Sequence, residues 1–169
     1  MYDKQQSSSF TLRVITAGGT IDKMYFDKPG QYEVGEPQVI PLLAEAGVAF
    51  EHCVEEAFRL DSQQMQDADR AKLRAHVEAA PESHIVITHG TDTMTQTAEC
   101  LMGIPGKVIV LTGAMQPARF HTSDASFNLG CAIAAVQLAP PGVYIAMNGY
   151  IFPAGSVRKN LEKGRFEWA

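Results

Sequence analysis

Two apolar runs in the chain each end in glycine followed by hydroxyl and carboxylate side chains. The first is Val14–Asp22 (VITAGGTID) and the second is Ile85–Thr93 (IVITHGTDT). Short, continuous apolar runs are typical of strands buried on both faces, and glycine lets the backbone turn sharply where such a strand ends. In open parallel sheets, ligands bind at the carboxyl ends of the strands. We therefore expect Thr20 and Thr91 to face one crevice and to share one substrate.

Strand-like and helix-like segments alternate along most of the chain. We expect strands at about 11–16, 48–54, 85–88, 108–111 and 143–147, and helices at about 39–46, 61–80, 92–102 and 123–138. The last helix is apolar nearly all round, so we expect it to be covered on both sides. Residues 150–157 are compatible with a further strand or hairpin. This alternation predicts a three-layer α/β fold with a mainly parallel (mixed) sheet and helices on both faces.

Length, charge and cysteine content narrow the class of protein. With 169 residues, the chain suits one domain at 11–169 preceded by a flexible segment at 1–10. A net charge of −5 without a basic stripe argues against nucleic acid as a partner. The three cysteines lack zinc-site spacing, so we expect no metal and no cofactor. The longest nearly apolar run, Leu129–Leu138, is too short for a membrane span, and the polar N-terminus does not resemble a signal peptide, so we expect a cytoplasmic protein.

The segment from Lys23 to Pro37 follows neither a strand nor a helix period. Prolines and glycines interrupt it, and a loop of this length beside a candidate site is typical of a lid. Its aromatic residues, Tyr25, Phe26 and Tyr32, would then close over a small ligand. The alternative is a surface loop whose aromatic residues pack on its own base.

Several common chemistries are excluded by missing motifs. The Gly18-Gly19 turn is not a dinucleotide fingerprint, because Asp22 stands where a third glycine would be and its carboxylate would repel a pyrophosphate. The chain contains neither a P-loop nor a G-x-S-x-G elbow. What remains is hydroxyl chemistry, in which a threonine needs a base for its proton and N–H groups for the oxyanion. Helix capping is the alternative role for Thr20 and Thr91, and likewise for Asp61 and Ser62.

The motifs together resemble the bacterial L-asparaginase/glutaminase family. The segments Thr16–Ile21 (TAGGTI) and Ile87–Met94 (ITHGTDTM) resemble its two signature segments. Leu111–Pro117 (LTGAMQP), Phe127–Leu129 (FNL) and Val143–Asn148 (VYIAMN) are similar to further family segments in the same order. The resemblance covers about residues 12–160 and implies the fold of the N-terminal domain of L-asparaginases.

The resemblance implies a role for each matching residue. In the catalytic group, Thr20 matches the nucleophile that attacks the side-chain amide, and Tyr32 matches the tyrosine that hydrogen-bonds it. A second cluster comprises Thr91, Asp92 and Lys159. The residues implied in substrate binding are Gly19, Ser62, Gln63, Gly90 and Ala114.

For three of the binding residues, the resemblance also implies which part of the substrate they contact. Ser62 and Gln63 match the pair that holds the α-carboxylate and α-ammonium of the substrate, and Ala114 would offer its carbonyl oxygen to the leaving nitrogen. Without the resemblance, Lys159 would be interpreted as an ordinary surface residue. Whether Tyr32, Lys159 or a water takes the proton of Thr20 is left open by the sequence.

The chain departs from the family's usual length. Most members carry a second domain, whose carboxylate reaches the substrate α-ammonium of a neighbouring subunit, and no counterpart is present up to Ala169. Losing one charge-assisted contact of about 1.5–3 kcal/mol predicts substrate binding weaker by about tenfold to a hundredfold.

The resemblance therefore implies a short L-asparaginase that hydrolyses L-asparagine to L-aspartate and ammonia, assembled as a homo-oligomer (dimer or tetramer). The alternative function is a non-catalytic amino-acid-binding module. A truncated fragment of a two-domain enzyme is the alternative origin of the chain.

Overall fold

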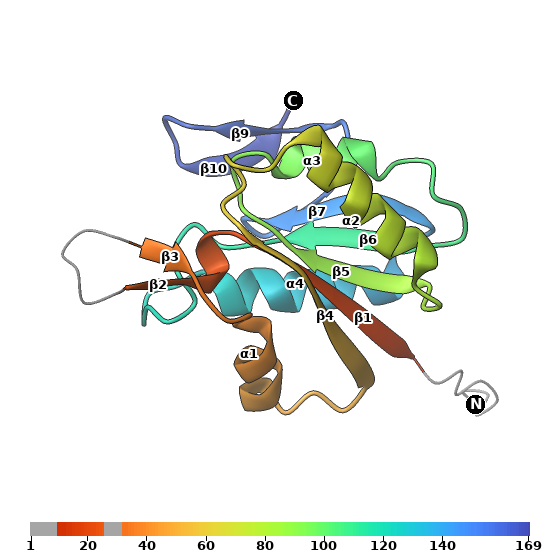
Figure 1. Ribbon diagram of the computed structural model, residues 1–169, viewed down its shortest axis with the longest axis horizontal. Coiled ribbons are helices and arrows are strands. Elements are labelled where there is room, and N and C mark those ends of the chain that lie inside the picture. Colours follow the sequence, from red (N-terminus) through yellow and green to blue (C-terminus); the bar gives the residue numbers. More distant parts are fainter. Residues whose placement is uncertain (1–9, 26–31) are drawn as a thin grey trace.

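The computed structural model describes residues 10–25 and 32–169, and within these ranges six strands form one main sheet (Figure 1). Its order is β4-β1-β5-β6-β7-β8, with β8 antiparallel to β7 and the other neighbouring pairs parallel. The sheet strands are β1 (Thr11–Gly18), β4 (Glu51–Leu60), β5 (His84–Thr88), β6 (Val108–Thr112), β7 (Gly142–Met147) and β8 (Tyr150–Pro153). The predicted mixed, mainly parallel sheet is confirmed.

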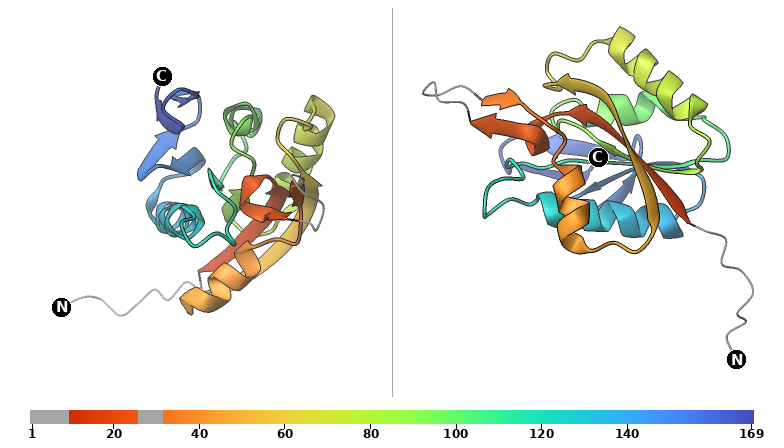
Figure 2. Two further views of the ribbon diagram at one scale, coloured as in Figure 1. Left: turned by 90° about the vertical axis from the view of Figure 1, so that its left-hand side faces the viewer. Right: turned by 60° about the horizontal axis from the view of Figure 1, so that its bottom comes forward.

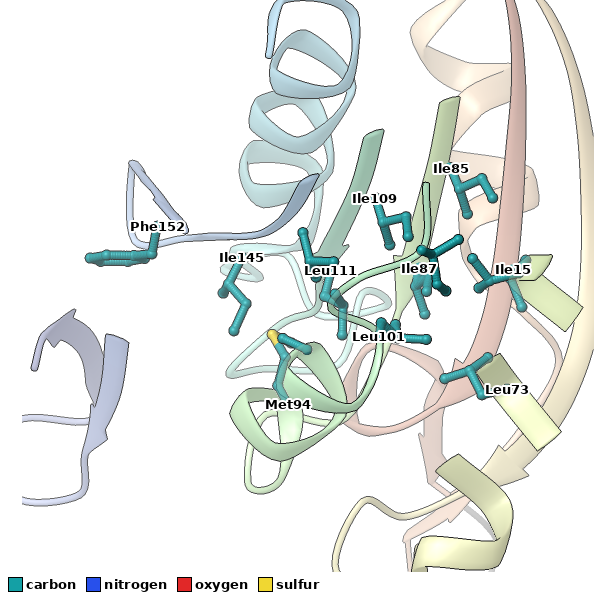
Figure 3. Packing of buried hydrophobic residues seen from close by; sticks show 14 of the residues in the cluster. Ile15, Leu73, Ile85, Ile87, Met94, Leu101, Ile109, Leu111, Ile145 and Phe152 are labelled. Carbon is teal, nitrogen blue, oxygen red and sulfur yellow. The ribbon is translucent and has the colours of Figure 1, made fainter. Parts of the chain in front are cut away.

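Helices cover both faces of the sheet, as predicted (Figures 1 and 2). They are α1 (Val39–Ala46), α2 (Asp67–Ala79), α3 (Met94–Cys100) and α4 (Ala125–Leu138). One buried cluster joins α2 and α3 to the sheet side chains that include Ile15, Ile87 and Leu111 (Figure 3). The other joins α1 and α4 to the opposite side, through Val14, Val86 and Val110. The alternation of these side chains between the two clusters follows from the two-residue period of a strand.

Two small hairpins are added to this core. The first pairs β2 (Lys23–Tyr25) with β3 (Tyr32–Val34), and a 3-10 turn, η1 (Thr20–Asp22), leads into it. The second pairs β9 (Val157–Asn160) with β10 (Arg165–Trp168) and docks on the core through Phe166, which is 2% exposed. The lid segment expected at 23–37 therefore contains two short strands. Residues 26–31, including Phe26, lie outside the described residues, as do 1–9 of the expected flexible segment, whereas Phe10 packs against Phe50 and His84.

Several predicted boundaries were wrong, for identifiable reasons. The edge strand β4 runs to Leu60 rather than to about Val54, because the charged residues Glu55, Glu56 and Arg59 interrupt its apolar pattern. Helix α2 begins at Asp67 rather than at Asp61, with the Asp69 carboxylate accepting a hydrogen bond from the Gln66 amide at 3.0 Å. Helix α3 is shorter than expected, at 94–100.

The expectation that α4 is covered on both sides was also wrong for this single chain. One stripe of α4 packs on the sheet, but Phe127 is 61% exposed and Leu138 85% exposed on its outer side. The uniform apolar character of α4 therefore leaves an apolar outer face.

The sheet order identifies where a ligand should bind. The chain first passes from β1 outward to β4 on one side, and then crosses back to β5, β6 and β7 on the other side of β1. The direction of the connections therefore reverses between β1 and β5. The crevice at such a switch point, beyond the carboxyl ends of the strands, is the usual ligand site of open α/β sheets. The turns after β1 and β5 are the Gly19–Thr20 and Gly90–Thr91 turns.

The connection through α4 has an unusual hand. The β5–α3–β6 and β6–α4–β7 crossovers move in the same direction across the sheet, yet α3 and α4 lie on opposite faces, so their hands are opposite. The crossover through α2 runs in the same direction and on the same face as the one through α3, so the two have the same hand. The crossover through α1 runs in the opposite direction and on the opposite face, which again gives the same hand. Since parallel crossovers are nearly always right-handed, β6–α4–β7 is the left-handed one.

No helix in the described ranges is long and apolar enough to cross a membrane.

Candidate active site

Three turns at the carboxyl edge of the sheet touch one another through glycines. Gly19 has φ +95°, and a β-carbon added there would overlap the amide nitrogen and Cα of Gly90. A β-carbon added to Gly90 would in turn lie 2.5 Å from Cβ and Oγ of Ser62. The turns after β1, β4 and β5 therefore meet at Gly19, Gly90 and Ser62, and glycine at 19 and 90 makes this close approach sterically feasible.

Thr91 and Asp92 form a polar cluster with Lys159, which comes from the distant strand β9. The Lys159 ammonium donates to Thr91 Oγ1 at 2.8 Å and to Asp92 Oδ1 at 2.5 Å. Gln63 Nε2 donates to the other carboxylate oxygen, Asp92 Oδ2, at 2.7 Å, and the Asp92 amide donates to Ser62 Oγ at 3.2 Å. The structure thus brings together five of the predicted site residues in one hydrogen-bonded group: Ser62, Gln63, Thr91, Asp92 and Lys159.

The electrostatics of this cluster favour an ionised Asp92. The hydrogen bond from Lys159 is the main cause that lowers the pKa of Asp92, burial opposes it, and the hydrogen bond from Gln63 lowers it further. Asp92 is therefore a carboxylate near neutral pH and can attract an ammonium group.

Thr20 lies directly after Gly19 and is part-buried at the start of η1. Its turn is attached to the loop that follows β6, because the Ala118 amide donates to the Ile21 carbonyl oxygen at 3.1 Å. Ala114, at the start of that loop, is fully buried in a small cluster with Ile21 and Ala125. The predicted residues Thr20 and Ala114 are therefore on adjoining loops of the same edge.

Tyr32 lies on β3 and is 48% exposed. Its ring packs edge-on against Tyr25, with centroids 5.7 Å apart, and near Phe120 of the loop after β6, at 6.5 Å. Its aromatic contacts therefore join the first hairpin to that loop.

Two buried groups that the sequence did not single out for catalysis support the turns. His89 is fully buried, with Nδ1 2.7 Å from the Gly90 carbonyl oxygen and Nε2 2.9 Å from Thr97 Oγ1, and burial lowers its pKa to about 4. Asp22 is 2% exposed and accepts a hydrogen bond from the Gln38 amide at 2.8 Å. Burial raises the pKa of Asp22 to about 6, with the Gln38 hydrogen bond opposing it. Their position next to a Gly-Thr turn was the only sequence signal for either residue.

In the part of the chain that the structure describes, no three His, Cys, Asp or Glu side chains gather closely enough to hold a metal ion.

Comparison with known proteins identifies the family. Residues 11–165 match the family model described as "Asparaginase, N-terminal". The chain belongs to the asparaginase family. It is 33% identical over 156 residues to L-asparaginase of Thermococcus kodakarensis, covering 88% of this chain and 47% of that protein. It is 32% identical over 134 residues to the glutaminase-asparaginase of Acinetobacter glutaminasificans, covering 74% of this chain and 38% of the relative.

The solved structure of the thermostable L-asparaginase from T. kodakarensis confirms the asparaginase-like fold. It superposes with a TM-score of 0.81 at 30% identity, over 94% of this chain and 51% of that one. This asparaginase-family chain therefore spans about half the length of the relatives it matches, or less.

Proposed function

We propose that the chain is an L-asparaginase that hydrolyses L-asparagine to L-aspartate and ammonia through a Thr20 acyl-enzyme. The observation that carries this proposal is the contact of Lys159 with Thr91 and Asp92, beside the turn that touches Gly19. Helix capping would explain Thr20 or Thr91 singly, but it does not explain why a lysine from β9 joins this cluster.

The proposed reaction begins with attack of Thr20 Oγ1 on the side-chain amide carbon of asparagine. Its C–N bond then breaks, the leaving nitrogen takes up the proton lost by Thr20 and departs as ammonia, and water hydrolyses the resulting ester to release aspartate and free Thr20. Backbone N–H groups of the glycine-rich turns would receive the oxyanion. Ionised Asp92 would bind the substrate ammonium together with Gln63, and Ser62 would bind the α-carboxylate.

In this proposal Lys159 has an electrostatic role. It donates hydrogen bonds to both Thr91 and Asp92, and an ammonium held in this way is a donor rather than a base. Proton transfer from Thr20 would then go to Tyr32 or to a water, and Tyr32 would close over the site with the first hairpin.

Ammonia release from asparagine by wild type and by Thr20→Ala tests the proposal. We expect Thr20→Ala to lose at least about a thousandfold in kcat, because removing a nucleophile leaves only binding and oxyanion stabilisation. Thr122→Ala, which changes an exposed threonine, is the matched control and should retain activity. An active Thr20→Ala would contradict Thr20 as the nucleophile, and an inactive wild type that binds asparagine would favour the amino-acid-binding module instead.

The same assay with glutamine measures substrate preference. The two amides differ by one methylene, which is worth about 1–3 kcal/mol in a pocket. We include weak glutaminase activity in the proposal.

The proposal extends to assembly and location. We infer a homo-oligomer, dimer or tetramer, because Phe127, Leu138 and Tyr150 expose large apolar side chains on α4 and β8. The three cysteines are free and part-buried, which suits the reducing cytoplasm.

A further inference from the structure

Lys23 and Asp61 form an ion pair between the first hairpin and the turn that carries Ser62 and Gln63. Lys23 Nζ lies 2.7 Å from Asp61 Oδ2, and the other oxygen, Asp61 Oδ1, accepts a hydrogen bond from the Gln63 amide at 3.0 Å. Lys23 is three residues after Thr20, and Asp61 directly precedes Ser62. The chemistry proposed above uses neither charge.

The ion pair is electrostatically linked to the candidate site. The positive charge of Lys23 helps to lower the pKa of Asp92, and the negative charge of Asp92 in turn opposes ionisation of Asp61. For Asp61, burial raises the pKa, but the hydrogen bonds from Lys23 and the Gln63 amide outweigh it and lower the pKa overall. Asp61 is therefore a second carboxylate beside Gln63, with Lys23 as its cation.

Both members of the pair are accessible to water. Their side chains are 26% and 29% exposed, and ion pairs with this access to water are weakly held. A free α-amino acid carries one ammonium and one carboxylate on the same carbon. Its carboxylate could pair with the Lys23 ammonium, and its ammonium with the Asp61 carboxylate.

We propose that Lys23 and Asp61 select the free α-amino acid, Lys23 by taking its α-carboxylate and Asp61 by taking its α-ammonium. This inference rests on the proposed function, since it assumes that the crevice binds asparagine and aspartate. It assigns specificity to two residues outside the Thr91–Asp92–Lys159 cluster. It also gives the α-ammonium a second carboxylate from within this chain.

Binding calorimetry with three product analogues tests the assignment. L-Aspartate carries both α-groups, succinate lacks the ammonium, and β-alanine lacks the α-carboxylate. We expect Asp61→Asn to weaken L-aspartate binding about tenfold and to leave succinate binding unchanged or tighter. Lys23→Met should weaken both L-aspartate and succinate about tenfold and leave β-alanine unchanged.

Two further variants distinguish ligand selection by Lys23 and Asp61 from a purely structural role of their ion pair. Glu36→Gln breaks a different ion pair, between Glu36 in the segment after β3 and Arg59 of β4 at 2.9 Å, and should not change the binding of any one ligand selectively. The double variant Lys23→Asp/Asp61→Lys restores an ion pair with reversed polarity, and we expect L-aspartate binding to stay at least tenfold weaker than wild type.

A uniform loss for all three ligands, recovery in the reversed pair, or wild type that binds succinate as well as L-aspartate would overturn the assignment. Ammonia release by the same wild-type preparation reports on the proposed function independently of these binding ratios.

Discussion

Gly19 shows how a single residue can set both the sheet and the site. Its φ of +95° is strained for any other residue, and a β-carbon there would overlap the Gly90 backbone. Since β1 and β5 pair in register up to Thr16 and Thr88, such an overlap would force the ends of two central strands apart. The geometry around Thr20 is therefore inseparable from the packing of the strand ends.

We predict that Gly19→Ala destabilises the fold by about 3 kcal/mol or more and abolishes ammonia release, because strain at positive φ adds to steric overlap. Gly47→Ala is the control: Gly47 also has positive φ, +61°, but nothing lies within 4 Å of an added β-carbon. Gly47→Ala should lower the free energy of unfolding by only about 1 kcal/mol. Urea denaturation measures both, and equal costs would show that the overlap with Gly90 is relieved.

Asp22 provides a residue-scale prediction about pH. Its pKa in the folded protein is raised to about 6 from 3.8, so between these values the folded state binds the proton more tightly than the unfolded chain does. The protonated form of Asp22 therefore stabilises the folded state relative to the ionised form. This contribution to the free energy of unfolding is fully present below the unfolded pKa of about 4 and is lost as the pH rises through 6. Asn keeps the oxygen that accepts from the Gln38 amide and cannot ionise.

We expect Asp22→Asn to be more stable than wild type by about 2–3 kcal/mol at pH 7.5 and equally stable at about pH 3. Denaturation across this pH range measures the difference, and His89 titrates identically in both proteins. A difference that does not change with pH would contradict the buried, ionisable state of Asp22.

At the scale of elements, the β9–β10 hairpin determines where Lys159 lies. Phe166 pairs with Lys159 across the hairpin, is buried in the α2–α3 cluster, and has its amide bound to Asn148 Oδ1 at 2.7 Å. Lys159 itself has a 13% exposed side chain, so its position depends on how the hairpin docks.

Removing the Phe166 ring should therefore affect activity as well as stability. We predict that Phe166→Ala costs about 3–5 kcal/mol of stability and lowers kcat in the fraction that remains folded, because Lys159 loses its fixed position. Leu161→Ala, at a 79% exposed site in the same hairpin, should change neither. Thermal unfolding and initial rates at low temperature measure the two effects, and full activity in folded Phe166→Ala would refute the link.

The elements also show which features the sequence could predict. Strands β1, β5, β6 and β7 were predicted because central parallel strands are continuous apolar runs, and α1 because Gly47 marks its end with a left-handed residue. The start of α2 could not be predicted from Asp61. Aspartate is a common helix N-cap, but the Asp61 carboxylate pairs with Lys23 and accepts a hydrogen bond from the Gln63 amide. Lys159 was found only through the family resemblance, since no local pattern relates a residue of β9 to the turn after β5.

At the scale of the whole molecule, the outer face of α4 and strand β8 form an uncharged surface. Residues 125–157 contain no Asp, Glu, Lys or Arg, and Phe127, Leu138 and Ile151 are among the exposed side chains on this side of the sheet. Apolar surface of this kind is typical of contacts between subunits.

We predict that wild type is a dimer or tetramer by light scattering and that Leu138→Glu shifts it to a smaller species, because a charge would have to be buried in the contact. Leu161→Glu changes a similarly exposed leucine outside this surface and should leave the mass unchanged. A monomeric wild type, or dissociation by both variants alike, would contradict the inference.

The left-handed crossover has a consequence for the order of events in folding. Because α4 returns on the α1 face, the loop after β6 passes beside the Thr20 turn, and Ala118 binds Ile21 from far along the chain. Contacts between such distant positions close late, after the local strand–helix units have formed. We therefore expect the local β5–α3–β6 unit to form before the loop reaches Ile21, so that the site is among the last parts of the domain to be completed.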